Sequence, residues 1–430
     1  MAEIGIGLMG LGVVGSGVAQ VLLQKGTALS QQAGITLALR RVLVRNPHKP
    51  RPLSLPEGLL TTNPDDLLNN PQCPIIVEVM GGEEPATTYI RRALEAGKHV
   101  VTANKEVIAK HGPHLFRLAQ QRQVYLLFEA SVGGGIPLIG PLQRDLLAND
   151  ILSIRAIING TTNYILTRMA RDGVDYHTAL QEAQAKGYAE PDPTNDVEGI
   201  DAVYKLAVLA LLAFRTPVPL PQIYREGITH LQAKDFRYAH ELGYEIKLLA
   251  IGRKENGTVQ ARVHPAFVPS HTLLAKVDGA YNAIEVQGDL VGRVVFHGLG
   301  AGPAPTSSAV VNDILTIARS VKAQARPLSW VNLHTALPVR PLHDLTTQYY
   351  LRLNVADRPG VLAQIAHILG DLSISIASVI QKDADPSAGT AEIVIMTHPA
   401  REGAMQEALG LIRRLPVVRE VSNLIRVEAE

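Results

Sequence analysis

The segment Gly10-Leu11-Gly12-Val13-Val14-Gly15 joins an apolar stretch, Ile4–Met9, to a helical pattern at Val18–Gln24. Two glycines in this setting let the backbone turn tightly and approach a pyrophosphate, and the third lets the helix pack closely on the strand. The helix N-terminus adds N–H donors and a positive dipole end. The motif alone is weak evidence, but a strand before it and a helix after it make it specific. The segment therefore predicts a dinucleotide-binding turn.

Short apolar runs alternate with helical stretches on both sides of this turn, through residues 1–149. Such alternation predicts βαβ units around a parallel sheet, and hence an α/β Rossmann domain. The expected strands are Ile4–Met9, Leu37–Val44, Ile75–Val79, His99–Ala103 and Val124–Ala130. A helical pattern at Ser308–Ser320 suggests that a segment at about 305–335 returns to this domain. We expect residues 150–304 to form an α+β catalytic and dimerisation domain.

A third zone follows the prolines Pro327, Pro338 and Pro341. From about residue 345 to residue 430, the expected elements come in the order strand, helix, strand, strand, helix, strand. That order is typical of the ferredoxin-like fold. The chain is also too long for one ordinary core, so several domains are the natural expectation.

The bulk composition is that of an ordinary globular protein. Hydrophobic residues make up 46%, charged residues 19%, and the net charge is +1. No basic field therefore suggests nucleic acid or a membrane surface as a partner. No apolar run is long enough to span a bilayer, and the start of the sequence shows no leader pattern. With one cysteine, Cys73, we expect a soluble protein of the reducing cytoplasm.

The choice between NAD and NADP depends on the side chains that come after the glycines. An NAD site usually carries an acidic residue about 20 positions later, which binds the ribose hydroxyls. No carboxylate occurs between Glu3 and Glu57, whereas Arg40, Arg41 and Arg45 lie on the second expected strand or just after it. Arginine suits a 2′-phosphate through its paired N–H donors. NADP(H) is therefore favoured, with NAD(H) as an alternative, unless these arginines are simply a solvated strand end.

Two segments concentrate functional side chains. Lys105 ends a strand-to-loop segment, at the edge of a parallel sheet that faces a ligand crevice. Asp201 and Lys205 are four residues apart and so share a helix face at the start of an apolar, buried helix. From spacing alone, a plain helical ion pair is a better explanation than catalysis. Asn195 is expected to cap this helix, with Glu198 in the capping-box position.

Four motifs together resemble homoserine dehydrogenases, in order along the whole chain. They are Thr102-Ala103-Asn104-Lys105, the loop from Glu129 to Pro137, Asn159-Gly160-Thr161-Thr162-Asn163-Tyr164-Ile165-Leu166, and Gly187-Tyr188-Ala189-Glu190-Pro191-Asp192-Pro193 with Asp201 and Lys205 downstream. The resemblance implies reversible, NAD(P)H-dependent reduction of L-aspartate 4-semialdehyde to L-homoserine, in the biosynthesis of threonine, methionine and isoleucine. It also implies a homodimer or homotetramer.

The same resemblance assigns roles to individual residues. Lys205 is the expected proton donor to the carbonyl oxygen, and Lys105 is expected beside nicotinamide and substrate. Glu190, Asp196 and Asp201 are expected to hold the substrate, since carboxylates suit its ammonium group. Which of the two lysines delivers the proton stays a hypothesis.

The glycine-rich loop is similar to the family's monovalent-cation site. The resemblance assigns sodium to Glu129, Val132, Gly134 and Ile136, mainly through main-chain oxygens, which suit a hard cation. A turn ordered without metal is the alternative. Gly302, within Gly300-Ala301-Gly302, is expected to contact the cofactor.

The run from Leu351 to Leu362 resembles the opening of an ACT domain, a module that senses small ligands, usually amino acids. Pro359 and Gly360 fit a turn into a helix. The family's pathway suggests threonine as the effector, and a module used only for dimerisation is the alternative.

Two rival functions stand beside this interpretation. A semialdehyde dehydrogenase acting through a thioester would need a nucleophilic cysteine, and Cys73 lies before a strand, at the wrong end for the crevice. A non-catalytic regulator that senses cofactor and amino acid would not require the polar residues Lys105, Glu190, Asp201 and Lys205.

Overall fold

The computed structural model describes residues 3–51, 53–327, 333, 337–382, 384–385 and 387–428. Two compact units divide the chain. Unit 1 comprises Met1–Ile154, Tyr204–Leu220 and Tyr281–Leu337, and unit 2 comprises Arg155–Val203, Pro221–Ala280 and Pro338–Glu430. These limits differ from the three zones expected from the sequence. Part of the expected returning segment, residues 328–332 and 334–336, lies outside the described residues.

Unit 1 is built on a six-stranded sheet with the order β3-β2-β1-β4-β5-β6. Every neighbouring pair in it is parallel. The order reverses beside β1, as in doubly wound dinucleotide-binding domains, so the α/β Rossmann prediction is confirmed. The strands are β1 (Glu3–Met9), β2 (Thr36–Leu43), β3 (Leu60–Thr61), β4 (Ile75–Glu78), β5 (His99–Thr102) and β6 (Leu126–Leu127).

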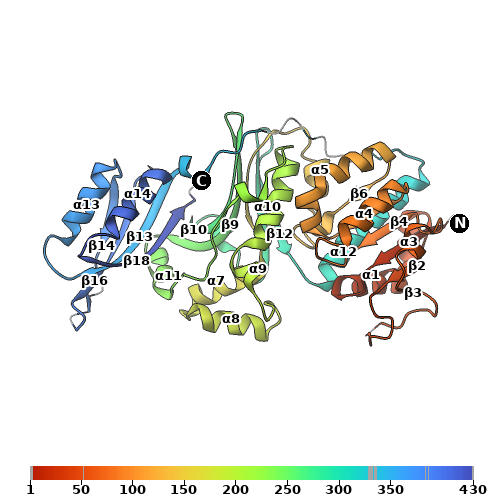
Figure 1. Cartoon of the computed structure of the whole chain (residues 1–430), viewed down its shortest axis with the longest axis horizontal. Coiled ribbons are helices and arrows are strands. Elements are labelled where there is room, and N and C mark those ends of the chain that lie inside the picture. The colour runs from red at the N-terminus through yellow and green to blue at the C-terminus, as the bar shows by residue number, and fades with distance from the viewer. Residues whose placement is uncertain are drawn as a thin grey trace. The chain divides into compact units, whose positions relative to one another are not determined.

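Helices cover this sheet, because crossovers between parallel strands need them. They are α1 (Val13–Gln24), α2 (Gly26–Ala33), α3 (Asp65–Leu68), α4 (Ala86–Glu95), α5 (Lys105–Arg122) and α12 (Pro303–Lys322). Helix α12, far along the chain, packs on α1 and shares one apolar core with β1 (Figure 1). Unit 1 also holds α6 (Ile139–Gln143) and the antiparallel hairpin of β11 (Tyr281–Gly288) and β12 (Gly292–Leu299).

Unit 2 contains a sheet with the strand order β9-β10-β18-β13-β16-β14. Its C-terminal part has the βαββαβ order expected of a ferredoxin-like unit, with both helices on one apolar core (Figure 1). The elements of that part are β13 (Thr346–Ala356), α13 (Val361–Asp371), β14 (Ile376–Ile380), β16 (Thr390–Thr397), α14 (Glu402–Ile412) and β18 (Val418–Val427), with two-residue strands β15 (Ala384–Asp385) and β17 (Ala400–Arg401).

The other elements of unit 2 come from the middle of the chain. They are α7 (Gly160–Asp172), α8 (Tyr176–Ala185), α9 (Thr194–Val197), β8 (Tyr224–Arg225), α11 (Ala233–Glu241), β9 (Tyr244–Glu255) and β10 (Thr258–Pro269). Strand β10 pairs with β9 on one side and, in parallel, with β18 on the other. One continuous sheet therefore joins the middle of the chain to the ferredoxin-like unit.

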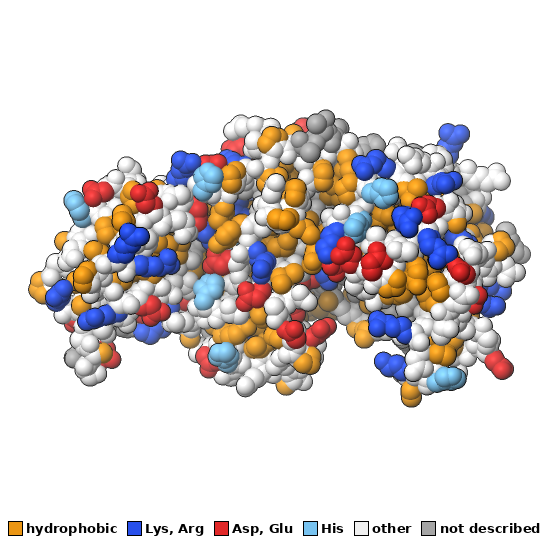
Figure 2. Space-filling model, in the orientation of Figure 1, with side chains coloured by type: hydrophobic (Ala, Val, Ile, Leu, Met, Phe, Trp, Pro, Cys, Tyr) orange, Lys and Arg blue, Asp and Glu red, His pale blue; other side chains and the backbone are white. Residues whose placement is uncertain are grey.

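Two elements cross the boundary between the units, β7 (Ile151–Ile157) and α10 (Ile200–Ala213). Residues Leu206–Leu212 of α10 are buried, as the apolar run predicted. No helix among the described residues has the length and apolar character needed to cross a bilayer. Acidic and basic side chains are interspersed on the face drawn in Figure 2, in keeping with a net charge of +1.

Candidate functional site

The glycine turn between β1 and α1 borders a cavity of about 780 Å³ in unit 1. A Cβ on Gly15 would lie 2.1 Å from the Gly10 carbonyl oxygen, so only glycine allows the helix to pack this closely. A Cβ on Gly12 would meet nothing within 4 Å, which leaves open space above the turn. This is the geometry that a pyrophosphate requires at a helix N-terminus. The cavity is lined by Gly10, Leu11, Gly12, Leu43, Val44, Arg45, Asn46, Lys49, Arg51, Thr62, Val79, Met80, Gly81, Glu84, Pro85 and Tyr89.

The arginines expected to select NADP lie in different places. Arg45 follows β2 and lines the cavity. Arg40 lies within β2, where its guanidinium pairs with Glu3, and it is not among the lining residues. Lys49 also lines the cavity. It was not predicted from the sequence, because a lysine in a loop after a strand belongs to no periodic pattern. The basic groups nearest the turn are therefore on the loop after β2.

Lys105 begins α5 directly after β5, at the same sheet edge as the glycine turn. Asn104 caps this helix by accepting from Val107 N at 3.2 Å, and its Nδ2 donates to Gly82 O at 2.7 Å. Asn104 thereby fixes the first turn of α5 against the loop after β4. That loop begins beside the cavity, since Met80 and Gly81 line it.

Gly302 is the N-cap of α12, with φ of 119°, which favours glycine. Ser307 of this helix donates from Oγ to the carbonyl of Val14 at 3.3 Å. The start of α12 therefore lies against the first turn of α1.

The loop expected to bind a cation is buried in unit 1. The Glu129 carboxylate accepts from Leu138 N at 2.5 Å, Ile139 N at 2.8 Å and Gly140 N at 2.7 Å. These bonds to the first turn of α6 already use both of its carboxylate oxygens. Val132, Gly134 and Ile136 lie on the same loop, and Val132 and Ile136 are fully or almost fully buried. No cluster of three or more His, Cys, Asp or Glu side chains arranged for a metal occurs among the described residues. A cation here would therefore depend on main-chain oxygens.

Two further buried polar groups lie close to this loop. Asp313 Oδ2 accepts from Glu129 N at 3.0 Å, and burial raises the pKa of Asp313 well above its usual range. The side-chain amide of Asn282 is buried beside Gly300, and neither of its polar atoms has a hydrogen-bond partner among the described residues. Gly300 in turn contacts Gly134 so closely that a Cβ on Gly134 would lie 2.5 Å from the Gly300 carbonyl oxygen. The loop therefore adjoins polar groups that a bound ion or water would satisfy.

Cys73 is fully buried before β4, and burial raises the pKa of its thiol. It lies at the amino end of a strand whose other end leads into the cavity. The site needed by a thioester mechanism is therefore absent around this cysteine, because a nucleophile must be exposed and readily ionised.

In unit 2 the structure brings two of the expected substrate residues together. Asn159 Nδ2 donates to Asp196 Oδ1 at 2.6 Å and to Asp201 Oδ2 at 3.0 Å. Asp201 is 8% exposed, at the start of α10, and Lys205 of unit 1 follows it one helical turn later. Glu190 is exposed, and among the described residues its carboxylate makes no hydrogen bond to this pair. Two of the three expected carboxylates thus form one cluster.

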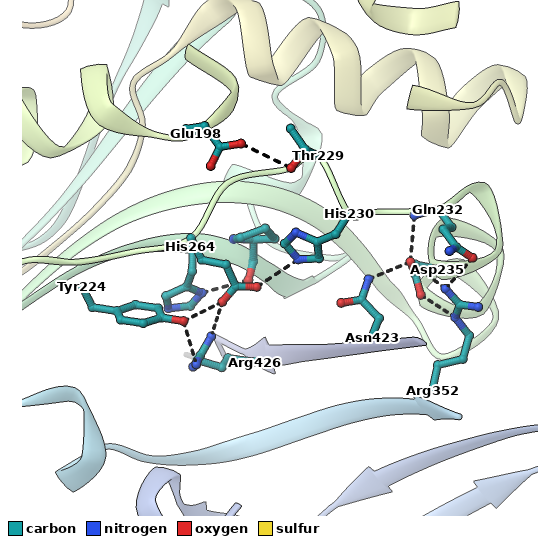
Figure 3. A network of polar contacts seen from close by, with 12 residues as sticks. Glu198, Tyr224, Thr229, His230, Gln232, Asp235, His264, Arg352, Asn423 and Arg426 are labelled. Carbon is teal, nitrogen blue, oxygen red and sulfur yellow. Dashed lines mark hydrogen bonds and ion pairs between the residues drawn. The ribbon is translucent and has the colours of Figure 1, made fainter. Parts of the chain in front are cut away.

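The expected cap at Asn195 is wrong. The short helix α9 already begins at Thr194, and Glu198 ends it. The Glu198 carboxylate instead accepts from Thr229 Oγ1 at 3.4 Å (Figure 3). Pro193 begins the turn earlier than the sequence suggested, since its fixed φ suits an early helical position.

A segment over residues 224–235 connects this region to the ferredoxin-like unit (Figure 3). In the middle of this segment, Ile228 N donates to the carbonyl of Val197, the residue after Asp196. Two buried ion-pair groups flank this contact, one around Arg426, which pairs with Glu226, and one around Asp235. Neither was expected from the sequence, because the partners are far apart along the chain.

The first group centres on Arg426 of β18, which is 1% exposed. Its guanidinium donates to Glu402 at 2.6 Å and to Glu226 at 2.9 Å. Burial works against the ionised form of Glu226, but hydrogen bonding from His230 and the charge of Arg426 outweigh it and lower the Glu226 pKa to about 2. The His230 pKa is raised by the same contact.

The second group centres on Asp235, which is fully buried in the first turn of α11. Its carboxylate accepts from Arg352 Nε at 2.7 Å, from Tyr350 Oη at 3.0 Å and from Asn423 Nδ2 at 2.9 Å. All three donors lie on strands of the ferredoxin-like unit. Asp235 therefore ties the middle of the chain to that unit through bonds that water does not reach.

Comparisons with known proteins agree with this geometry. Residues 10–129 match the homoserine dehydrogenase NAD-binding domain, residues 137–315 match homoserine dehydrogenase, and residues 349–417 match the ACT domain. Homoserine dehydrogenase of Neisseria gonorrhoeae is 41% identical over 100% of this chain and 99% of its own length, and that of Synechocystis sp. is 43% identical over 98% and 99%.

Solved structures extend the likeness. A homoserine dehydrogenase from Thiobacillus denitrificans has a TM-score of 0.93 and 43% identity over 100% of this chain and 99% of its own. A hyperthermophilic archaeal homoserine dehydrogenase in complex with NADPH has a TM-score of 0.64 and 28% identity, over 74% of this chain and 98% of its own. The glycine turn, the paired carboxylates and the full-length likeness lead to one conclusion: this chain belongs to the homoserine dehydrogenase family and is an oxidoreductase with a pyridine-nucleotide-binding domain and a C-terminal ACT domain.

Proposed function

We propose that the chain reduces L-aspartate 4-semialdehyde to L-homoserine, reversibly, in the cytoplasm. The observation that carries this proposal is the carboxylate pair of Asp196 and Asp201, with Lys205 one helical turn after Asp201. The substrate carries an ammonium group that carboxylates bind, and an aldehyde whose oxygen needs a proton as it is reduced. Glu190, on the segment before α9, would complete the substrate contacts.

The two lysines have different tasks in this proposal. When bound, the reduced nicotinamide supplies the hydride to the aldehyde carbon. Lys205 gives a proton from Nζ to the carbonyl oxygen as that oxygen gains charge, which forms the alcohol. Lys105, at the start of α5 and at the sheet edge that carries the cofactor cavity, orients the nicotinamide and the substrate.

NADP(H) is the preferred cofactor in this proposal. Arg45 and Lys49 lie on the loop that lines the cavity and would pair with a 2′-phosphate. The stretch between Glu3 and Glu57 has no carboxylate for a free ribose hydroxyl. Gly10, Leu11, Gly12, Val13, Val14 and Gly15 hold the pyrophosphate, and Gly302 contacts the cofactor from the start of α12.

A monovalent cation, sodium, is proposed at the loop of Glu129, Val132, Gly134 and Ile136. The residues fit such an ion because the loop is buried and its main-chain oxygens are the available donors. The unpartnered amide of Asn282 beside Gly300 supports the same assignment. Such an ion would stiffen the loop beside α12.

The ACT domain is proposed to bind threonine and to lower activity. The segment over residues 224–235 supports this role. Its middle contacts Val197, and on either side of that contact it pairs with Arg426 and Arg352 of the ferredoxin-like unit. A ligand that changes the packing of β13 or β18 would therefore reach the backbone beside Asp196. A homodimer or homotetramer is proposed as the working assembly.

The first test compares NADPH and NADH oxidation by the wild type, Lys205→Ala and Lys105→Ala with L-aspartate 4-semialdehyde. Lys205→Ala removes the proposed general acid, and it should lower kcat by about 10²–10⁴-fold. Lys276→Ala, which removes an exposed lysine from unit 2, serves as the matched control and should keep wild-type activity.

Two outcomes would change the proposal. An active Lys205→Ala with an inactive Lys105→Ala would move the proton to Lys105. A folded wild type that turns over neither cofactor would favour the alternative of a non-catalytic sensor of cofactor and amino acid.

A further inference from the structure

Asn159 lies between β7 and α7 and is 5% exposed. Its Oδ1 accepts from Thr162 N at 2.9 Å and from Thr162 Oγ1 at 3.0 Å, which caps α7. An asparagine at this position of a helix needs no further explanation than capping. The Nδ2 group of the same side chain, however, makes a second set of hydrogen bonds that capping does not require.

Both hydrogens of the Asn159 amide group point at carboxylates. Nδ2 donates to Asp196 Oδ1 at 2.6 Å and to Asp201 Oδ2 at 3.0 Å. A primary amide has two N–H donors, so the donor capacity of Asn159 is fully used. The cap fixes the orientation, because turning the amide over would place an oxygen against two carboxylates.

Two carboxylates that converge on one nitrogen are otherwise unfavourable neighbours. Like charges at short distance repel, and the repulsion is strong where water is scarce. A neutral donor between them reduces this cost without adding a charge that would compete with a substrate. Thr161, two residues on, also donates from Oγ1 to the carbonyl of Tyr188 at 2.6 Å, so the start of α7 holds the segment before Glu190 as well.

We propose that Asn159 is a positioning residue that holds Asp196 and Asp201 together, ready to receive the ammonium group of an amino-acid substrate. A site arranged before binding loses less entropy when the substrate arrives. This inference rests on the proposed function, since it assumes that the two carboxylates bind the substrate. Asn159 itself acts through the carboxylates and does no chemistry.

The test uses two variants that keep the helix cap. Asn159→Asp is nearly isosteric and caps equally well, but it loses both donors and adds a third carboxylate. Asn159→Ser caps and adds no charge, but it is too short to reach the carboxylates. Asp175→Asn is the matched control, because Asp175 caps the neighbouring helix α8 by accepting from Thr178 N at 3.0 Å and contacts neither carboxylate.

The expected result is a KM effect confined to one substrate. Losing hydrogen bonds to charged groups should raise the KM for the semialdehyde about tenfold or more in Asn159→Ser, and further in Asn159→Asp. The KM for NADPH should stay within about twofold, and Asp175→Asn should match the wild type. If Asn159 only capped α7, both variants would keep the wild-type thermal stability and the wild-type ratio of KM values.

Three results would overturn the inference, and they differ from a failure of the proposed function. Wild-type KM values in Asn159→Asp would exclude the bridge. Equal loss for both substrates in Asn159→Ser would show a structural role. If Asp196→Asn and Asp201→Asn raise the semialdehyde KM while both Asn159 variants do not, only the bridge is wrong. If the Asp196 and Asp201 variants also keep the wild-type KM, the proposed substrate contacts themselves fail.

Discussion

The cofactor cavity and the ACT junction, by which we mean the buried ion-pair groups around Asp235 and Arg426, are specified in two different ways. The cavity is shaped mainly by backbone, at a turn where Gly10 and Gly15 allow close approach within ten residues of sequence. The junction is held by charged side chains that lie 117 to 200 positions apart, such as Arg352 with Asp235 and Arg426 with Glu226. Short-range geometry leaves a motif in the sequence, whereas long-range charge pairing leaves none.

The cavity and the junction should also differ in how strongly a substitution lowers the free energy of unfolding. The residues packed beneath the glycine turn, such as Leu8 and Val18, are apolar, so truncating one leaves a cavity but no unpaired charge. At the junction, removal of one partner leaves the other charge buried and unpaired, which costs more than the pair contributes. Substitutions at the junction should therefore have larger effects on stability than substitutions around the cavity.

Removing a buried arginine should have the largest effect. Arg352→Ala leaves Asp235, which is fully buried, without its bidentate partner, and should lower the free energy of unfolding by about 3–5 kcal/mol. Urea denaturation measures this change. The control is Arg401→Ala, whose pair with Asp344 is exposed and should contribute little to the free energy of unfolding. Equal losses of unfolding free energy in the two variants would contradict the expected difference between buried and exposed ion pairs.

Acid should destabilise the junction through a buried histidine. Burial, aided by the charges of Arg426 and Arg262, lowers the His264 pKa to about 4. The unfolded chain binds the proton more readily, so this stability is complete above about pH 6.5 and is lost as pH falls towards 4. The loss should reach about 2 kcal/mol by pH 5.

Urea midpoints at pH 7 and pH 5 test this expectation. His264→Gln should be less stable than the wild type at pH 7 but should lose less stability on acidification. His99, in unit 1, has its pKa lowered to about 4 by burial alone and should contribute a similar slope, which remains in the His264 variant. An unchanged slope in His264→Gln would show that His264 is not the titrating group.

Cofactor preference should respond to Arg45 and hardly to Arg40. Arg45→Ala removes a charge from the cavity lining and should raise the KM for NADPH about tenfold, while the KM for NADH stays within about twofold. Arg40→Ala breaks the exposed pair with Glu3 and should change neither value appreciably. Initial rates with both cofactors provide the measurement. The opposite pattern would place the 2′-phosphate beside Arg40.

The smallest effect on activity is expected at Cys73. Cys73→Ser should keep full turnover, since the thiol is buried before β4 and takes no part in the proposed chemistry. Burying a hydroxyl in its place should cost about 1–3 kcal/mol unless a partner is found. Loss of activity in a variant that remains folded would revive the thioester alternative.

Much of the fold was predictable because its signals are local. The glycine turn, the alternation of strands and helices, and the βαββαβ order each come from local patterns of sequence, and each is confirmed. Strand β6 lies within the predicted Val124–Ala130 but is only two residues long, and β3 was not predicted because two residues show no periodicity. The cap at Asn195 failed for a related reason: Pro193 starts the turn earlier, and one proline outweighs the capping pattern.

The candidate site was predictable in part. Asp196, Asp201 and the two lysines were named through the resemblance, but the amide that joins the carboxylates lies 37 and 42 residues away in sequence. Lys49 is a loop lysine without a pattern. The pairing of Asp235 with Arg352 spans 117 residues, which no reading of one sequence supplies.

The parallel pairing of β10 with β18 has a consequence for synthesis. Strand β10 ends at Pro269 and its partner begins at Val418, so the ribosome must add about 150 residues before the pair can form. At about 5–20 residues per second, this takes roughly 7–30 s, a long time for the edge of β10 to stay without its partner strand. A nascent chain of this protein is therefore expected to depend on chaperones most while the ACT domain is being translated.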